Sequence, residues 1–320
     1  MRPKNALVGV DIGGTKTAVL VSLKAPSVLD RVEFPTKPAR GPGPALRLIE
    51  AGIRDLLAKH RLKPAAIGVS CGGPLDRLRG IIQAPPNLST WVDVPIKAML
   101  EDEFGVACRL ENDANAGAVA EHRFGAGRGC RNMVFLTMGT GLGAGIIIDG
   151  RLYRGTNDFA GEIGHVRLSR SGPVGYHKAG SVEGWVSGGG MPQRAETAVK
   201  AALKRRQSTT LAELLQKGKP ITAREVALAA RKGDVVAARV LRSTGERLGA
   251  VLGILVDILN PEKIVIGGLA MRLGNTLLGP AREVMQREAL PYSSAVCQIV
   301  PAQLGERIGD VAALCVAMGL

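Results

Sequence analysis

The sequence predicts a mixed α/β protein of two domains, and three observations lead to that fold class. The chain has 320 residues, more than a single hydrophobic core usually organises. Two short apolar runs are each followed by a glycine-rich turn and a second apolar run, which is the pattern of a β-hairpin. Other segments repeat apolar residues at helical spacing. Hairpins that alternate with helices are typical of the α/β class.

The two hairpins occupy residues 7–23 and 133–148. Their turns read DIGGTKT at 11–17 and TMGTGLG at 137–143. A third glycine motif, Gly267-Gly268, follows an expected strand at 263–266 and precedes a helix-compatible stretch. Because the same strand–turn–strand unit recurs, the sequence indicates a duplicated architecture.

Helices are expected between and after these motifs. Apolar spacing predicts them over 45–60, 94–104, 114–124 and 243–259, and the polar segment 192–242 has a helical composition. We place a hinge near residues 113–116, which divides the chain into a smaller lobe over 1–114 and a larger lobe over 115–307. The last helix, 308–320, is expected to return to the first lobe.

Composition limits the classes of function. Hydrophobic residues make up 46% of the chain, which is enough for sizeable cores. The net charge of +14 suits an anionic partner such as a nucleotide or polyphosphate, although a solvated basic surface accounts for it as well. The densest basic run, 200–206, contains no aromatic residue on which bases could stack. We therefore expect no nucleic-acid partner.

The cysteines and the apolar segments bear on location. The five cysteines are far apart and form no C-x-x-C pair, which is typical of free thiols in a reducing compartment. The apolar run at 6–10 is too short for a signal peptide, and the uncharged stretch 133–148 is shorter than the ~20 residues of a membrane helix. We expect a cytoplasmic protein without a membrane partner.

The first glycine turn is a candidate phosphate site. Residues 13–16 (GGTK) match neither a P-loop nor a dinucleotide fingerprint, because a strand and not a helix follows the glycines. A hairpin turn can still present backbone N–H groups to phosphate, and Asp11 at its entrance could hold Mg²⁺ through water. A plain turn is the alternative for either motif alone. The second turn, with Gly139 and Thr140, favours a pair of phosphate loops.

A second group of polar residues suits a sugar. The segment 111–115 (ENDAN) lies where an apolar strand meets a helix, so Asn112 or Asp113 could simply cap that helix. Carboxylates, an imidazole and an amide also lie in glycine-rich or proline-rich surroundings, where they could accept hydrogen bonds from hydroxyl groups. These residues are Asn87, Glu162, His165 and Glu183. Each alone is typical of a loop, whereas together they would form a sugar site.

In this order, the motifs DIGGTK, ENDANA, TMGTGLGAG, GEIGH, GSVEG and IVIGG resemble those of the ROK (repressor, open reading frame, kinase) family of the actin-like ATPase superfamily. The resemblance covers nearly the whole chain. It implies a ribonuclease H-like fold of two α/β lobes with a cleft between them, a homodimer, and the transfer of a phosphoryl group from ATP with Mg²⁺.

The resemblance also implies roles for individual residues. Asp113 matches the general base. The first phosphate loop would be Asp11, Gly13, Gly14, Thr15 and Lys16, the second Thr137, Gly139, Thr140 and Gly141, with Gly267 and Gly268 beside adenosine. The sugar contacts would be Gly73, Asn87, Asn112, Asp113, Glu162, His165 and Glu183.

The chain departs from this family at its zinc site. Many members bind zinc with the GEIGH histidine and three cysteines, but Val174, Tyr176 and Ser181 stand at the cysteine positions here. We therefore expect no zinc. We expect Val174, Tyr176 and Val182 to form an apolar cluster in its place, with Tyr176 contributing most of the buried area.

The expected activity is that of an ATP-dependent hexose kinase. Glucose is the first choice of acceptor, because the ENDA, GEIGH and E-G motifs are similar to those of family glucokinases, while fructose, mannose and N-acetylglucosamine stay open. Polyphosphate could replace ATP as the donor. A sugar-sensing transcription regulator is the rival from another class, but only ten residues precede Asp11, too few for a DNA-binding helix-turn-helix.

Overall fold

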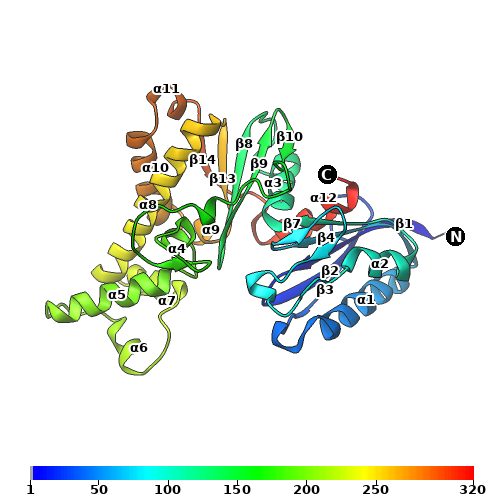
Figure 1. The fold of residues 1–320 in the computed structure, drawn as a ribbon, viewed down its shortest axis with the longest axis horizontal. Helices are drawn as coiled ribbons and strands as arrows, with labels where there is room; N and C mark the ends of the chain where they lie inside the picture. The colour runs from blue at the N-terminus through cyan, green and yellow to red at the C-terminus, as the bar shows by residue number, and fades with distance from the viewer. Residues whose placement is uncertain (1–2) are drawn as a thin grey trace. The chain divides into compact units, whose positions relative to one another are not determined.

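The computed structural model describes residues 3–320, which form two compact units (Figure 1). The first unit contains the described residues as far as Arg128, together with Leu152–Ala160 and Leu304–Leu320; the second contains Gly129–Arg151 and Gly161–Gln303. The boundary therefore differs from the one expected after residue 114. Helix α3 (Asp113–Phe124) stays with the first unit because it packs against α12 (Ile308–Met318), and its buried Glu121 accepts a hydrogen bond from the N–H of Leu304.

The first unit is built on a five-stranded sheet whose order is β3-β2-β1-β4-β7. Strand β1 pairs with β2 antiparallel and with β4 parallel, and β4 pairs with β7 parallel. The first predicted hairpin is therefore confirmed. The strands are β1 (Lys4–Ile12), β2 (Lys16–Ser22), β3 (Asp30–Pro35), β4 (Leu62–Cys71) and β7 (Cys108–Asn112), and a small separate ribbon is formed by β5 (Leu75–Asp76) and β6 (Ile81–Ile82).

Alternate residues of β1 face opposite sides of this sheet. Val8 and Val10 enter a core that also contains Ile49 of α1 (Pro42–Lys59), and α2 (Ile96–Phe104) contributes to the same core. On the other side, a methyl group added to Gly9 would lie 3.1 Å from the Cβ of Ala313 in α12. A strand of period two therefore carries α1 on one face and α12 on the other.

The second unit repeats this arrangement. Its sheet has the order β10-β9-β8-β13-β14, in which β8 pairs with β9 antiparallel and β13 pairs with both β8 and β14 parallel. A hairpin followed by parallel strands is again the pattern, so the predicted duplication is confirmed. The strands are β8 (Met133–Met138), β9 (Leu142–Ile148), β10 (Arg151–Tyr153), β13 (Lys263–Ile266) and β14 (Gln298–Pro301).

The longest helix, α8 (Val235–Leu259), organises the helices of the second unit. It begins eight residues before the expected start, because the Asp234 carboxylate accepts hydrogen bonds from the N–H groups of Val236 and Ala237, both at 3.0 Å. Glycines let α8 approach α10 closely: a methyl group on Gly249 would lie 2.5 Å from the carbonyl oxygen of Ala281.

The predicted helical segment 192–242 is confirmed. Helices α5 (Met191–Lys204), α6 (Ala212–Gln216) and α7 (Ala223–Arg231) gather around the first half of α8 (Figure 1) and share one apolar cluster with it. The remaining elements are α4 (Val182–Val186), α9 (Leu269–Leu273), α10 (Asn275–Glu288), α11 (Pro291–Ser294), the ribbon β11 (Val174–Gly175) and β12 (Lys178–Ala179), and the 3₁₀ turns η1 (Pro38–Arg40), η2 (Pro86–Leu88), η3 (Ile163–His165) and η4 (Gly305–Arg307). Across residues 3–320, every helix is too short or too polar to cross a bilayer.

The packing of α12 on β4 leaves no room for a side chain at Gly68. A methyl group there would lie 2.1 Å from the backbone nitrogen of Ala317 and 2.3 Å from the carbonyl oxygen of Ala313. Because these obstacles are backbone atoms, we expect Gly68→Ala to destabilise the protein by about 1–3 kcal/mol or more, the usual range for overpacking. Urea unfolding monitored by circular dichroism measures this loss.

The matched control is Gly279→Ala on α10, where an added methyl group meets nothing within 4 Å. This variant should be as stable as the parent or more stable by up to about 1 kcal/mol, because alanine favours a helix. A Gly68→Ala variant as stable as the parent would contradict the described contact between α12 and β4.

Candidate functional site

The first glycine turn joins β1 to β2 in the first unit. The N–H of Gly13 donates to the carbonyl of Lys16 at 3.0 Å, and the Thr36 hydroxyl donates to the carbonyl of Gly13 at 2.6 Å. A methyl group on Gly14 would lie 2.6 Å from the Cβ of Asn87, so the turn packs directly on the segment that carries Asn87. Thr15 and Lys16 are exposed. The turn is therefore held in place from behind while its tip faces solvent.

The parallel strands of the first unit bring distant residues to one edge of the sheet. Asp11 of β1 pairs in register with Ser70 of β4, and Ser70 pairs with Glu111 of β7. The chain leaves β4 through Gly72-Gly73 and leaves β7 into α3 at Asp113. A methyl group on Gly73 would lie 3.3 Å from the side-chain nitrogen of Asn112. The carboxyl ends of parallel strands are a frequent place for ligands in α/β folds.

Asp11 has an unusual environment at this edge. Its carboxylate packs so closely on the first turn of α12 that a methyl group on Gly309 would lie 2.1 Å from it. Burial, and then the carboxylates of Asp113 and Asp310, raise the pKa of Asp11 to about 7, against the opposing effect of Arg31 and Lys16. Carboxylates whose charge is incompletely balanced suit a divalent cation.

Asp11 would hold magnesium only with help from other ligands. Among residues 3–320, no group of three or more histidine, cysteine, aspartate and glutamate side chains is arranged to hold a metal ion. Mg²⁺ commonly takes one or two carboxylates and completes its shell with phosphate oxygens and water. The residues present therefore fit a magnesium ion that arrives with phosphate.

Lys16 belongs to a chain of ion pairs. Its ammonium group lies 2.9 Å from Glu33, which also accepts from Arg31 at 2.5 Å, and Arg31 in turn donates to Asp310 at 3.0 Å. This chain joins the turn to the first turn of α12. Arg31, Glu33 and Asp310 carry no motif and were not predicted; the ion pairs arise from strand pairing between β2 and β3 and from the return of the C-terminal helix.

Asn112 is the N-cap of α3, as the capping alternative predicted. Its side-chain oxygen accepts from the N–H groups of Ala114 at 2.9 Å and Asn115 at 3.3 Å. Because Asn112 takes the cap, the Asp113 carboxylate is left exposed and accepts from the N–H of Ala114, at 2.8 Å. Desolvation by surrounding protein atoms raises the pKa of Asp113, and that hydrogen bond partly offsets the rise. A raised pKa suits a proton acceptor.

Glu111, two residues earlier, has the opposite environment. Its side chain is fully buried and accepts from both Nε and a terminal nitrogen of Arg154, at 3.0 and 2.9 Å. Its other oxygen accepts from the N–H of Asn112 and the amide of Asn115. The sequence assigned no role to Glu111 or Arg154. Glu111 lies in the ENDANA motif, whereas nothing in the sequence points to Arg154.

The second glycine turn, in the second unit, joins β8 to β9. The N–H of Gly139 donates to the carbonyl of Gly141 at 3.1 Å. The N–H groups of Gly188 and Gly189 donate to the carbonyls of Gly139 and Thr140, at 2.8 and 2.9 Å. Gly139 and Thr140 are exposed. As in the first turn, hydrogen bonds from a neighbouring segment fix the backbone and leave the tip open.

Gly267 and Gly268 lie beside this turn. They follow β13, which runs parallel to β8, and the N–H of Gly267 donates to the carbonyl of Leu136 at 2.8 Å. Gly268 has a φ of 66°, and a methyl group there would lie 2.2 Å from the carbonyl oxygen of Met138. Only glycine fits this approach, so the structure brings together the two motifs predicted for phosphate and adenosine.

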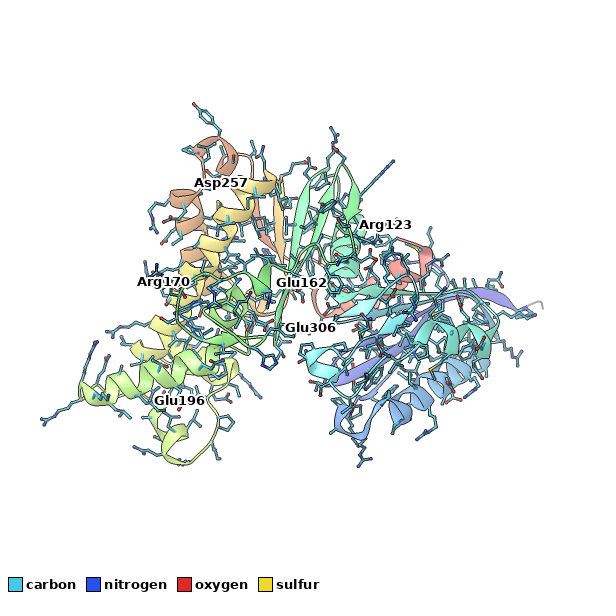
Figure 2. All side chains as sticks on the ribbon, viewed as in Figure 1. Arg123, Glu162, Arg170, Glu196, Asp257 and Glu306 are labelled. Carbon is cyan, nitrogen blue, oxygen red and sulfur yellow. The ribbon has the colours of Figure 1, made fainter. Side chains whose placement is uncertain are left out.

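The predicted sugar residues of the second unit gather near the same turn. A side-chain oxygen of Glu183 accepts from the N–H of Leu142 at 3.0 Å, just after the turn. Gly164 packs between the two residues: a methyl group there would lie 2.2 Å from the carbonyl of Leu142 and 3.5 Å from the Cβ of Glu183. Glu162 (labelled in Figure 2) and His165 flank this glycine and are exposed.

The loop that carries zinc in related proteins contains no such ligand set. Val174 and Tyr176 are about half exposed, at 46% and 50%, so the predicted apolar cluster is wrong for both; only Val182 is buried. Tyr176 and His177 have positive φ angles at the tip of the β11–β12 ribbon, which turns the tyrosine outward. Its ring meets His165 edge-on, with centroids 5.6 Å apart. Valine, tyrosine and serine at these positions do not fit zinc.

Comparisons with known proteins agree with this architecture. A glucokinase of Halalkalibacterium halodurans is 35% identical over 313 residues, which cover 95% of this chain and 92% of that protein. The glucokinase of Streptomyces coelicolor is 33% identical over 310 residues, with 96% and 95% covered. The structure of a ROK family glucokinase from Streptomyces griseus in complex with glucose and AMPPNP superposes with a TM-score of 0.82 at 32% identity and covers 98% of this chain and all of that one.

The family model described as the ROK family matches residues 7–318, nearly the whole chain. The actin-like α/β fold expected from the motifs is also the fold of the solved relatives. The chain belongs to the ROK family, as its motifs, its duplicated hairpin sheets and these matches show.

Proposed function

We propose that this protein is an ATP-dependent hexose kinase that converts glucose to glucose 6-phosphate. The observation that carries the proposal is the exposed Asp113 carboxylate at the sheet edge that also bears Asp11 and the first glycine turn. Relatives at 33–35% identity are named glucokinases, which supports both the reaction and the sugar. Other hexoses as acceptors are one alternative, which the sugar panel below separates. Polyphosphate as donor is another, which a comparison of polyphosphate and ATP with glucose as acceptor separates.

The proposed chemistry begins at Asp113. Its carboxylate accepts the proton of the sugar hydroxyl as that oxygen attacks the γ-phosphorus of ATP, and ADP leaves on the opposite side. Asn112 caps α3 and so leaves the Asp113 carboxylate unoccupied by the helix end. A correctly placed general base contributes about 10²–10⁴-fold to such a reaction.

The two glycine turns would bind the phosphates through backbone N–H groups. Magnesium, when it arrives with the nucleotide, supplies positive charge for the phosphate oxygens. Asp11 is the residue we assign to it, through water, because burial and two neighbouring carboxylates leave its charge poorly balanced. Lys16 pairs with Glu33 where both side chains are solvent-accessible. The lysine can therefore leave this pair and approach a bound phosphate.

Sugar recognition is assigned to side chains of both units. Asn87, Asn112 and Asp113, with the backbone at Gly73, supply acceptors and donors in the first unit; Glu162, His165 and Glu183 supply them in the second. A site that hydrogen-bonds each hydroxyl rejects a sugar whose altered hydroxyl leaves a buried polar group unpaired.

The setting is also a proposal. The five cysteines lie outside disulfides, which supports a reducing compartment such as the cytoplasm. We propose a homodimer in solution, which light scattering of the purified protein measures directly.

Asp113→Ala tests the base. We expect kcat to fall by about 10²-fold or more, because the hydroxyl proton then has no acceptor, while glucose still binds. Coupled ADP-release kinetics and calorimetric glucose binding measure the two effects. Asp55→Ala on the exposed side of α1 is the control and should keep full activity. Near-normal turnover in Asp113→Ala would remove this residue from the mechanism.

The raised pKa values predict an acid limb near neutrality. Asp11 and Asp113 must be ionised to act, and both have raised pKa values, that of Asp11 about 7. We expect kcat/KM for glucose to fall as the pH drops through about 7. Arg31 lowers the pKa of Asp11, so Arg31→Met should move this limb to higher pH. A pH profile of both proteins over pH 5–9 measures the shift.

A limb near the ordinary carboxyl value of about 4 would contradict the described environment of Asp11. The sign for stability is the reverse of the sign for activity. The folded state holds the Asp11 proton more tightly than the unfolded chain does, so this group lowers stability as the pH rises from about 4 to about 7.

A sugar panel tests the acceptor. Glucose should give the highest kcat/KM, and His165→Ala should raise the glucose KM by about 10-fold or more, which matches roughly 1.5–3 kcal/mol for a hydrogen bond to a charged group. Glu183→Ala should impair ATP use as well, because Glu183 also accepts from Leu142 beside the second turn. His177→Asn is the control for His165, since asparagine tolerates the left-handed φ of 60°. Preference for another hexose would overturn the assignment to glucose and leave the kinase.

A further inference from the structure

Residues 166–184 connect the GEIGH turn to α4 without the cysteines that bind zinc in related proteins. Backbone hydrogen bonds cross this loop: the N–H groups of Leu168 and Ser169 donate to the carbonyl of Gly180, and the N–H of Val182 donates to Val166. Ser181, at a former cysteine position, caps α4 and donates to the carbonyl of Gly175. These bonds order the loop internally, and the side-chain amide of Gln193, on α5, donates to the carbonyl of Val174 at 2.8 Å and accepts from its N–H at 2.9 Å.

Trp185 makes a second attachment, which reaches α8 as well as α5. Its indole N–H donates to the Ser169 hydroxyl at 2.7 Å, and its ring packs so tightly on Gly172 that a methyl group there would lie 2.5 Å from it. The guanidinium carbon of Arg247, on α8, lies 4.5 Å from the ring centroid, and that of Arg194, on α5, lies 5.4 Å away. One side chain therefore links the loop to two helices.

Arg194 is buried, and no carboxylate within residues 3–320 forms an ion pair with it. It donates instead to the carbonyl of Trp185 at 2.8 Å, the hydroxyl of Thr244 at 2.6 Å and the carbonyl of Val240 at 3.3 Å. Burial and the neighbouring Arg247 lower its pKa to about 10, so it remains charged at neutral pH. A buried cation held by dipoles and a ring fixes its partners in one geometry.

The segment around Trp185 reaches two parts of the candidate site. Two residues before it, Glu183 accepts from the N–H of Leu142. Three and four residues after it, Gly188 and Gly189 donate to the carbonyls of Gly139 and Thr140 in the second glycine turn. A displacement of Trp185 would therefore move both the sugar-site glutamate and the phosphate turn.

We propose that Trp185, Arg194 and Arg247 form an anchor, named here the Trp185 anchor, that positions Glu183 and the second glycine turn without zinc. The three are positioning residues, because they would act on substrates through Glu183 and the turn. The effect on sugar and ATP rests on the proposed kinase function, whereas the anchoring of residues 166–184 does not.

Arg247→Met and Trp185→Leu test the anchor. Arg247→Met removes the cation of one cation–π contact and keeps an unbranched side chain. Trp185→Leu removes the ring and keeps an apolar side chain. We expect the KM for glucose and for ATP to rise about tenfold, with a smaller change in kcat. Trp185→Phe, which keeps a ring for the arginines but loses the indole N–H, should give an intermediate result. Arg242→Met, an exposed position on the same helix, is the control and should change neither KM.

Limited trypsin digestion supplies a readout that does not depend on catalysis. The loop contains the exposed Arg167 and Arg170 (labelled in Figure 2) and the half-buried Lys178. Loss of the anchor should speed cleavage at these sites at least several-fold, as measured by mass spectrometry, while the control is cut at the parent rate. If the anchor variants are cleaved faster in the loop and the parent protein has no hexose kinase activity, the anchor is supported and the proposed kinase function is wrong.

Other outcomes contradict the anchor. Unchanged loop cleavage and unchanged KM values in Arg247→Met would show that the cation–π contact has no positioning role. A lowered Tm with unchanged KM values and loop cleavage would mean that the cluster acts through general packing alone. Stoichiometric zinc in the untagged protein, or activity lost to a zinc chelator with Mg²⁺ restored and regained only with zinc, would show that a metal holds the loop instead.

Discussion

The candidate site of the first unit depends on one ion pair, between the buried Glu111 and the partly exposed Arg154. Glu111 is fully buried and uses both oxygens, one for Arg154 and one for the backbone of Asn112 and the amide of Asn115. These bonds fix the turn from β7 into α3. Loss of one partner of a buried pair leaves a charge without compensation, at a typical cost of about 3–5 kcal/mol. Two residues later, the Asp113 carboxylate accepts from the backbone and faces solvent. The surroundings therefore give Glu111 a structural role and Asp113 a chemical one.

The hairpins and the cap of α3 could be predicted from the sequence, because each depends on residues that are neighbours in the chain. Glycine turns between apolar runs identified both hairpins, and the polar residues between strand and helix limited the cap of α3 to Asn112 or Asp113. Contacts between residues far apart in the sequence could not be predicted this way. Arg154 reaches Glu111 across more than forty residues, and Arg31 reaches Asp310 across nearly the whole chain. Their pairing depends on which strands neighbour one another, and apolar periodicity does not determine that order.

The position of α3 has a similar explanation. The sequence placed the hinge at the start of this helix, where polar residues follow a strand. Its buried face instead packs on α12, whose residues lie at the other end of the chain. Glycine at position 68 lets α12 lie directly on β4, since any larger residue would strike the backbone of α12. The expected apolar cluster at Val174 and Tyr176 was wrong for a related reason: the consecutive left-handed residues at the ribbon tip turn the tyrosine toward solvent and His165.

A loop held by a metal and a loop held by Trp185 differ physically. A metal gathers side chains at one point, and its binding free energy depends on ligands that must be deprotonated and on free metal. The contacts here are spread over an indole, two guanidinium groups and several backbone bonds, and none of them depends on free metal. Each is weak, but together they connect α4 to α5 and α8, the longest helix of the unit. Because Glu183 lies on α4 and the glycines that support the second turn follow it, an anchor at Trp185 can hold the site together even though valine, tyrosine and serine stand where the family has its zinc cysteines.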